Sequence, residues 1–187
     1  MAWRNDPQRY GGIAIALHWT IALLIVTQFV LANMAEQAEE AGSLMGQIAW
    51  LARHKSVGIT ILGLAVVRLL WRLGNAPPAL PGDMAGWQKS ASVVTHWLMY
   101  GFLFALPLSG WAMSSAANFS VSWFDLVRLP NFVGPSENLK EQLKVVHEVL
   151  AKALFVTTLL HVAAALKHHF KDRDGVLLRM FGISRAP

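Results

Sequence analysis

Long apolar runs are the feature of this sequence that most restricts its fold. Three of them end at Met34, Trp71 and Ser114, and a fourth follows in the last third of the chain. A helix needs roughly 20 residues to cross a hydrocarbon core of about 30 Å, and these runs are long enough. Charged residues make up only 14% of the sequence, against about 25% in soluble domains. The sequence therefore predicts an integral membrane protein.

Cysteine is absent from the 187 residues. This excludes disulfides, iron–sulfur clusters, thiolate zinc sites and covalently attached c-type haem, which requires a Cys-x-x-Cys-His run. The net charge of +5 could suggest nucleic acid, but in a membrane protein it is better explained by topology. We expect no cleavable signal peptide, because the first apolar run follows a polar stretch and is too long for a signal core.

We predict an all-α fold, a transmembrane four-helix bundle that forms a single domain over residues 1–187. The expected spans are 12–34, 51–73, 91–114 and 142–170. The prolines of APPALPG (76–82) cannot continue a helix, so they separate the second span from the third. Pro107 lies inside the third span and should kink it, which neighbouring helices in lipid can accommodate.

Charge predicts which way the bundle faces. The N-terminus, the second connection and the C-terminal tail together hold ten basic and four acidic residues, whereas the other side holds six basic and seven acidic ones. Lys and Arg accumulate on the cytoplasmic side of membrane proteins. Both termini are therefore predicted to be cytoplasmic, which agrees with an even number of spans.

Histidines recur at matched depths in these spans. In the predicted orientation His18 and His96 lie near the cytoplasmic side, and His54 and His147 lie near the outer side. His161 comes fourteen residues after His147, about 21 Å and close to whole turns, so it reaches the inner half on the same helix face. Two layers result, in which His147 faces His54 and His161 faces either His18 or His96.

Two facing imidazoles make a suitable axial pair for haem iron, and a four-helix bundle builds such sites from facing helices. Arg68 comes fourteen residues after His54, near inner-layer depth, where a guanidinium could pair with haem propionates. Alternatively, Arg68 extends to the interface and the buried histidines only hydrogen-bond between helices. A further alternative is a transporter whose histidines bind a metal ion or relay protons, which predicts no haem and repeated halves with broken helices.

Four stretches cover all the predicted spans in order, and they are RYGGIAIALHW (9–19), HKSVGITILGLAVVRLLWRL (54–73), HWLMYGFLFALPLSGW (96–111) and VVHEVLAKALFVTTLLHVAAALKHHF (145–170). Together they resemble the bacterial cytochrome b561 family, four-helix dihaem b cytochromes of the inner membrane that include superoxide oxidase.

The resemblance implies two non-covalent haem b groups, with the iron of the inner haem ligated by His18 and His161 and that of the outer haem by His54 and His147. It also implies a ubiquinone site near the cytoplasmic end, where His168 matches a quinone-contacting histidine.

The function implied is electron transfer across the membrane, from an outer donor to ubiquinone as the electron acceptor. If superoxide is the donor, the protein is a superoxide:ubiquinone oxidoreductase. The alternative is a cytochrome b anchor subunit that passes electrons between a partner dehydrogenase or hydrogenase and the quinone pool.

The resemblance leaves several polar residues open. His96 is expected to be a pocket residue beside the ligands, and His168 with His169 could instead anchor the chain in the headgroup region. Lys152 lies inside the fourth span, where it either extends outward or adds positive potential near the outer haem. The sign of the field met by superoxide does not follow from the sequence, because acids (Glu36, Glu39, Glu40) and bases (Arg53, Lys55, Lys144, Lys152) share the outer side.

Overall fold

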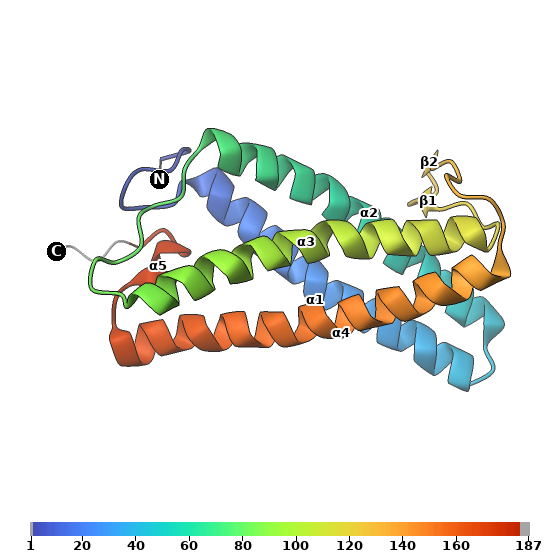
Figure 1. Ribbon diagram of the computed structural model, residues 1–187. Helices are drawn as coiled ribbons and strands as arrows, with labels where there is room; N and C mark the ends of the chain where they lie inside the picture. The colour runs from blue at the N-terminus through green and yellow to red at the C-terminus, as the bar shows by residue number, and fades with distance from the viewer. Residues whose placement is uncertain (1, 184–187) are drawn as a thin grey trace. The chain divides into compact units, whose positions relative to one another are not determined.

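The computed structural model describes residues 2–183, and it consists mainly of four long helices (Figure 1). These are α1 (Gly12–Glu40), α2 (Leu44–Gly74), α3 (Gly86–Ala116) and α4 (Glu137–Lys167). A π-helical turn, η1 (His168–Asp172), continues α4, and a short helix, α5 (Val176–Arg179), follows it. The predicted all-α fold with four spans is confirmed.

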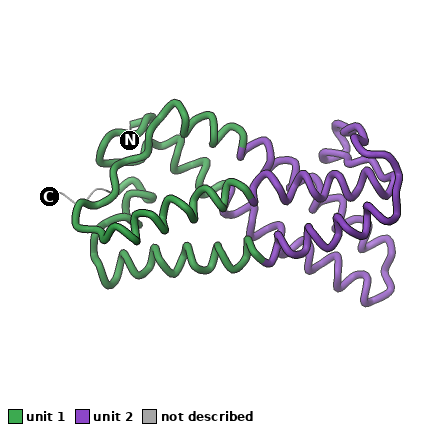
Figure 2. The backbone as a smooth tube through the Cα atoms, viewed as in Figure 1, with its two compact units in different colours: residues 1–20, 66–101, 153–187 green, residues 21–65, 102–152 purple. Residues whose placement is uncertain are grey.

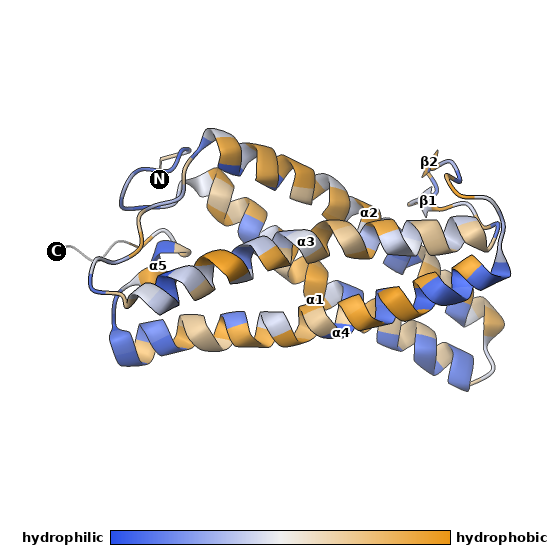
Figure 3. Ribbon diagram, viewed as in Figure 1, coloured by the Kyte–Doolittle hydropathy of each residue, from blue (hydrophilic) through white to orange (hydrophobic). Residues whose placement is uncertain are grey.

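Each long helix is able to cross a membrane by its length and composition. Large apolar side chains are exposed on all four helices, among them Leu23, Leu70, Val94 and Leu160, each 64–67% accessible. Figure 3 shows apolar colouring along the four helices. Soluble proteins rarely expose so much contiguous apolar surface, so this surface is explained by contact with lipid.

The helices extend beyond the apolar runs that predicted them. Helix α1 continues from residue 34 to Glu40, and α3 begins at Gly86 rather than at 91. Helix α4 begins at Glu137, next to Ser136, whose hydroxyl accepts a hydrogen bond from the backbone N–H of Leu139. Polar residues can continue a helix outside the hydrocarbon core, so hydropathy marks the membrane crossing and not the helix ends.

The backbone divides into two compact units (Figure 2). Unit 1 comprises residues 1–20, 66–101 and 153–187, and unit 2 comprises residues 21–65 and 102–152. Each unit contains segments of all four long helices. The histidines predicted for the inner layer belong to unit 1, and those predicted for the outer layer belong to unit 2.

In unit 1 the C-terminal segment packs on α1. The indole N–H of Trp19 donates to the carbonyl of Met180 at 2.8 Å, and the Trp19 ring lies 4.9 Å from that of Phe181. Arg179 donates to the carbonyl of Ala79, which belongs to the α2–α3 connection. The C-terminal segment therefore holds α1 and this connection together.

In unit 2 a small hairpin caps one side of α2. Strands β1 (Ser122–Trp123) and β2 (Val127–Arg128) are antiparallel, and the turn places Phe124 and Asp125 at φ values of 49° and 59°. A turn with positive φ at both central residues suits a tight hairpin, although glycine or asparagine usually occupies such positions.

Helix α2 holds this hairpin in place. The Ser56 hydroxyl lies 3.0 Å from the Ser122 carbonyl and accepts a hydrogen bond from the Phe124 N–H, and the indole of Trp123 donates to the Thr60 hydroxyl at 3.0 Å. Ser56 is buried and follows His54 by two residues, so the hairpin is bound close to a predicted ligand.

Candidate haem-binding site

Unit 1 brings three histidines together. His18 of α1 and His161 of α4 have ring centroids 6.3 Å apart, with ring planes inclined by 60°. His96 of α3 is the other candidate partner of His161 that the sequence left open. Its ring centroid is 5.4 Å from that of His161, in an edge-on arrangement. The histidines predicted for the inner layer therefore lie together, and they include both candidate partners of His161.

Arg68 of α2 joins this group. Its Nη2 atom lies 3.0 Å from Nδ1 of His18, and its guanidinium carbon is 5.7 Å from the centroid of the Tyr100 ring. A guanidinium has donors only, so His18 Nδ1 accepts this hydrogen bond, and the proton of a neutral His18 is on Nε2. A metal can bind Nε2 of His18 only if Arg68 gives up this hydrogen bond.

Further cations surround the same end of unit 1. Arg72 lies over the Trp97 and Tyr100 rings, at 5.6 and 5.9 Å from their centroids. Burial raises the pKa of the Tyr10 phenol, and the nearby charges of Arg72, Arg68 and Arg179 oppose this rise. Tyr10 therefore stays neutral, and the cluster keeps a net positive charge that suits a carboxylate-bearing ligand.

Unit 2 holds the second pair. His54 of α2 and His147 of α4 have ring centroids 6.3 Å apart, with planes inclined by 69°. Nδ1 of His54 is buried without a hydrogen-bond partner among the described residues. By contrast, Nδ1 of His147 lies 2.9 Å from the hydroxyl of Ser109 in α3. A Cβ added at Gly110 would lie 3.2 Å from Cε1 of His147, so the ring packs directly on the α3 backbone.

The spacing of both pairs fits a metal between two imidazoles. A metal–nitrogen bond is about 2.0 Å, and a ring nitrogen lies roughly 1.1 Å from its centroid, so two imidazoles on opposite sides of one ion have centroids about 6.2 Å apart. The observed value is 6.3 Å for His18–His161 and for His54–His147. The 5.4 Å separation of His96 and His161 is shorter than the separation calculated for two imidazoles that share one ion.

His168 lies apart from these pairs, in η1. Its Nδ1 is 2.6 Å from a carboxylate oxygen of Asp174 and 3.1 Å from one of Asp172. Carboxylates only accept hydrogen bonds, so Nδ1 carries a proton and Nε2 is left for another partner. A cavity of about 310 Å³ is lined by His168, the two aspartates, Asp83, Met84, Ala85 and Gln88.

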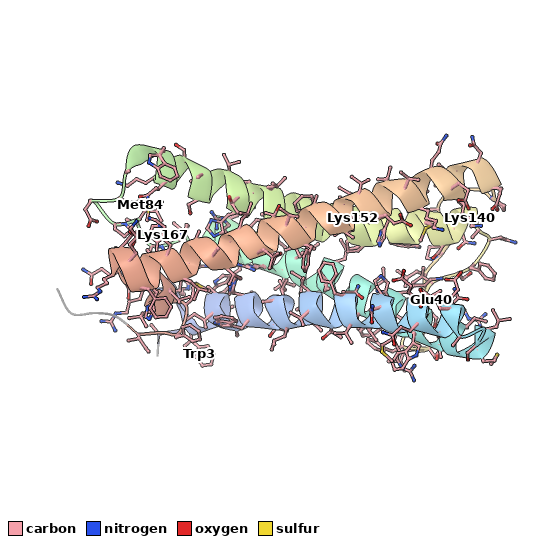
Figure 4. All side chains as sticks on the ribbon, turned by 90° about the horizontal axis from the view of Figure 1, so that it is seen from below. Trp3, Glu40, Met84, Lys140, Lys152 and Lys167 are labelled. Atoms are coloured by element: carbon pink, nitrogen blue, oxygen red, sulfur yellow. The ribbon has the colours of Figure 1, made fainter. Side chains whose placement is uncertain are left out.

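The remaining residues that the sequence left open are near the surface. Lys152 is exposed on α4, and Figure 4 labels it along that helix together with Lys140. The ring of His169 stacks edge-on against that of Phe170, with centroids 4.8 Å apart, and is partly exposed. Neither side chain belongs to the two paired sites.

The sequence did not single out Ser109, Gly110 or Asp174. Serine and glycine in a transmembrane helix are ordinary packing residues, and only the register of α3 against α4 shows that these two contact His147. In the sequence Asp174 is only one of the charges near the C-terminus. The turn at Arg173 and Gly175, both with positive φ, brings its carboxylate to His168.

Comparison with known proteins supplies the family. Residues 9–182 match the family model described as prokaryotic cytochrome b561. The chain belongs to this family. It is 31% identical to cytochrome b561 homolog 2 of Escherichia coli over 100% of this chain and 98% of the relative. It is 29% identical to the probable superoxide oxidase CybB of Yersinia pestis, over 96% and 99% of the two chains. A cytochrome b562 of Cereibacter sphaeroides is 27% identical over 91% and 94%.

Family membership confirms the resemblance found in the sequence. The protein is a membrane cytochrome b, and the family implies binding of b-type haem. The predicted ligand residues, the single-domain assignment and the orientation of the termini stay predictions.

Proposed function

We propose that this cytochrome b561-family protein transfers electrons across a bacterial inner membrane through two haem b groups, one held by His18 and His161 and the other by His54 and His147. Ubiquinone is the proposed acceptor, near His168. The observation that carries the proposal is the equal ring spacing of the two histidine pairs, 6.3 Å in each unit. A separation of this size leaves room for one metal ion between the two rings of each pair.

Haem, when bound, supplies a one-electron couple that exchanges electrons at its edge. Two histidines would hold each of the two irons, and two such ligands would leave no coordination position open for dioxygen. The side chain of Arg68 would turn from His18 to a propionate, with which it can form a bidentate ion pair. Without this hydrogen bond, Nδ1 of His18 can carry the proton, which leaves Nε2 able to bind a metal.

His168 is proposed to serve the quinone end. Its Nδ1–H is held by Asp174 and Asp172, which leaves Nε2 able to hydrogen-bond a quinone carbonyl or to carry its proton. The cavity of about 310 Å³ beside it is of the size used for small-molecule ligands.

Superoxide is the proposed donor. It gives up one electron and leaves as dioxygen, so two superoxide ions and two protons convert one ubiquinone to ubiquinol. Similarity to the probable superoxide oxidase CybB over nearly the whole chain supports this choice. Arg53 and Lys144, exposed on unit 2, would attract the anion, whereas the exposed Glu36, Glu39 and Glu40 of the same unit would repel it.

The first experiment is an optical spectrum of the purified protein in detergent, oxidised and dithionite-reduced, with haem quantified per chain. We expect about two low-spin b haems per chain. Absence of haem after expression with ample haem supply would contradict the proposal and favour a transporter.

Turnover with superoxide and ubiquinone then tests the donor and the acceptor. We expect His168→Ala to lower quinone reduction while haem content stays unchanged, and His169→Ala, the adjacent control, to behave like the unmodified protein. A protein that contains both haems but shows no turnover would instead be an anchor subunit that needs a partner dehydrogenase or hydrogenase.

A further inference from the structure

We propose that Ser109 is a positioning residue that fixes the tautomer and the ring direction of His147, so that Nε2 of His147 is presented to the haem iron. The inference rests on the proposed ligation by His147, and concerns how α3 prepares a histidine of α4.

The hydroxyl of Ser109 lies between two partners. Its Oγ is 2.9 Å from the carbonyl oxygen of Leu106 and 2.9 Å from Nδ1 of His147. A hydroxyl has one proton to donate, and a carbonyl oxygen can only accept. Both contacts are hydrogen bonds only if Ser109 donates to Leu106 and Nδ1–H of His147 donates to Ser109.

This arrangement determines where His147 can bind a metal. When Nδ1 of a neutral imidazole carries the proton, Nε2 has a free lone pair. Metal-ligating histidines commonly donate their other N–H to an oxygen, which fixes the ring and raises the basicity of the ligand nitrogen. Ser109 is only 8% exposed, so bulk water competes little for this hydrogen bond.

The backbone of α3 restricts the same ring from a second side. An added Cβ at Gly110 would lie 3.2 Å from Cε1 of His147 and 3.6 Å from its Nδ1. The ring therefore occupies the space that a side chain at position 110 would need, with its Nδ1 edge toward Ser109. Neighbouring residues of α3 thus fix both the position of the ring and the direction of its N–H.

Other buried polar groups can be compared with the contact between Ser109 and His147. Ser115, in the same helix, donates to the Trp111 carbonyl at 3.0 Å and is fully buried. It forms the same kind of intrahelical bond as Ser109 and provides a matched control. Among the other proposed ligands, His18 Nδ1 faces the donor Arg68, and His54 Nδ1 has no partner within the described part of the chain.

The test compares Ser109→Ala, Ser109→Thr and Ser115→Ala in the haem-loaded protein. The readouts are the midpoint potential of each haem, by spectroelectrochemical titration, and the rate of haem transfer to apomyoglobin. In Ser109→Ala we expect one haem, and only one, to have a higher potential, because a less basic histidine stabilises the ferric iron less. The same haem should be lost roughly ten times faster or more.

Threonine keeps the hydroxyl and should restore both values, and Ser115→Ala should match the unmodified protein. Equal potentials and transfer rates in Ser109→Ala and Ser115→Ala would overturn the inference. If Ser109→Ala does not assemble, Ser109→Cys takes its place, because sulfur is a weaker acceptor. Identical potentials in Ser109→Cys and Ser109→Thr would likewise overturn it.

His147→Ala separates this inference from the proposed function. Loss of one haem in His147→Ala, together with an unchanged Ser109→Ala variant, would refute the role of Ser109 alone. Retention of both haems in His147→Ala would refute the ligation, and with it the inference built on that ligation.

Discussion

Gly110 offers a direct test of the contact between α3 and the ring of His147. A methyl group added there would lie 3.2 Å from Cε1 and 3.6 Å from Nδ1. Carbon atoms pack best at about 3.5–4.0 Å, so the ring in Gly110→Ala must move by roughly 0.3 Å or more. This movement also disturbs the 2.9 Å hydrogen bond to Ser109.

Overpacking of this kind costs about 1–3 kcal/mol. If that cost falls on the ligated state, it corresponds to roughly 5- to 150-fold weaker retention of the haem bound by His54 and His147. The other haem should be retained normally, because its proposed ligands His18 and His161 belong to unit 1.

The assay is transfer of haem to apomyoglobin in detergent, followed by absorbance and by the haem left per chain. Gly101→Ala is the matched control, because it lies in the same helix and an added Cβ there has no atom within 4 Å. Two-phase loss in Gly110→Ala, with only one phase faster than in Gly101→Ala, is the expected result. Equal kinetics in the two variants would refute the argument that Gly110 limits the position of His147.

Three further changes test other parts of the site. His54→Ala should remove one haem and leave about one per chain, whereas His169→Ala should keep both; an unchanged haem content in His54→Ala would rule out this ligand. Arg68→Leu should weaken retention of the haem assigned to His18 and His161 by roughly 10- to 100-fold, since hydrogen bonds to a charged group contribute about 1.5–3 kcal/mol. The apomyoglobin assay measures this retention, and a normal value would exclude propionate binding by Arg68. Trp123→Phe removes the hydrogen bond from the indole to Thr60 and should lower the stability of unit 2 by about 1 kcal/mol. This loss should appear as release of haem at a lower temperature. An unchanged temperature would mean that the hairpin does not stabilise α2.

The four helices could be predicted because the membrane imposes a strong and local rule. Apolar length determines where a chain can cross lipid, and the expected spans all lie within the observed helices or, at the end of α4, within η1. The hairpin at 122–128 was not predicted. Its turn has Phe124 and Asp125 at positive φ, and neither residue carries the glycine or asparagine signal of such a turn. It depends instead on hydrogen bonds with Ser56 and Thr60, which are distant in the sequence.

The site was predictable only where helix periodicity could be used. The spacing of His147 and His161 placed them on one face, and depth alone grouped His18 and His96 as alternatives for the inner layer. Depth could not choose between them, because that choice depends on how α1 and α3 are rotated about their axes. The structure supplies the rotation and places both rings beside that of His161, so the choice of His18 stays a prediction. Ser109 depends on the same kind of information, because its chemistry appears only once α3 is in register with α4.

The attachment of the hairpin to α2 determines where the chain can accept a reporter domain. An insertion at Asp125 would pull on the bonds to Ser56, two residues from His54. The turn between α1 and α2 is a better place, because Gly42 has a φ of 68° and an added Cβ there would have no atom within 4 Å. Exposed turns of this kind tolerate insertions well. A fluorescent or enzymatic fusion at Gly42 would therefore report the sidedness of the membrane protein without pulling on the hydrogen bonds between the hairpin and Ser56.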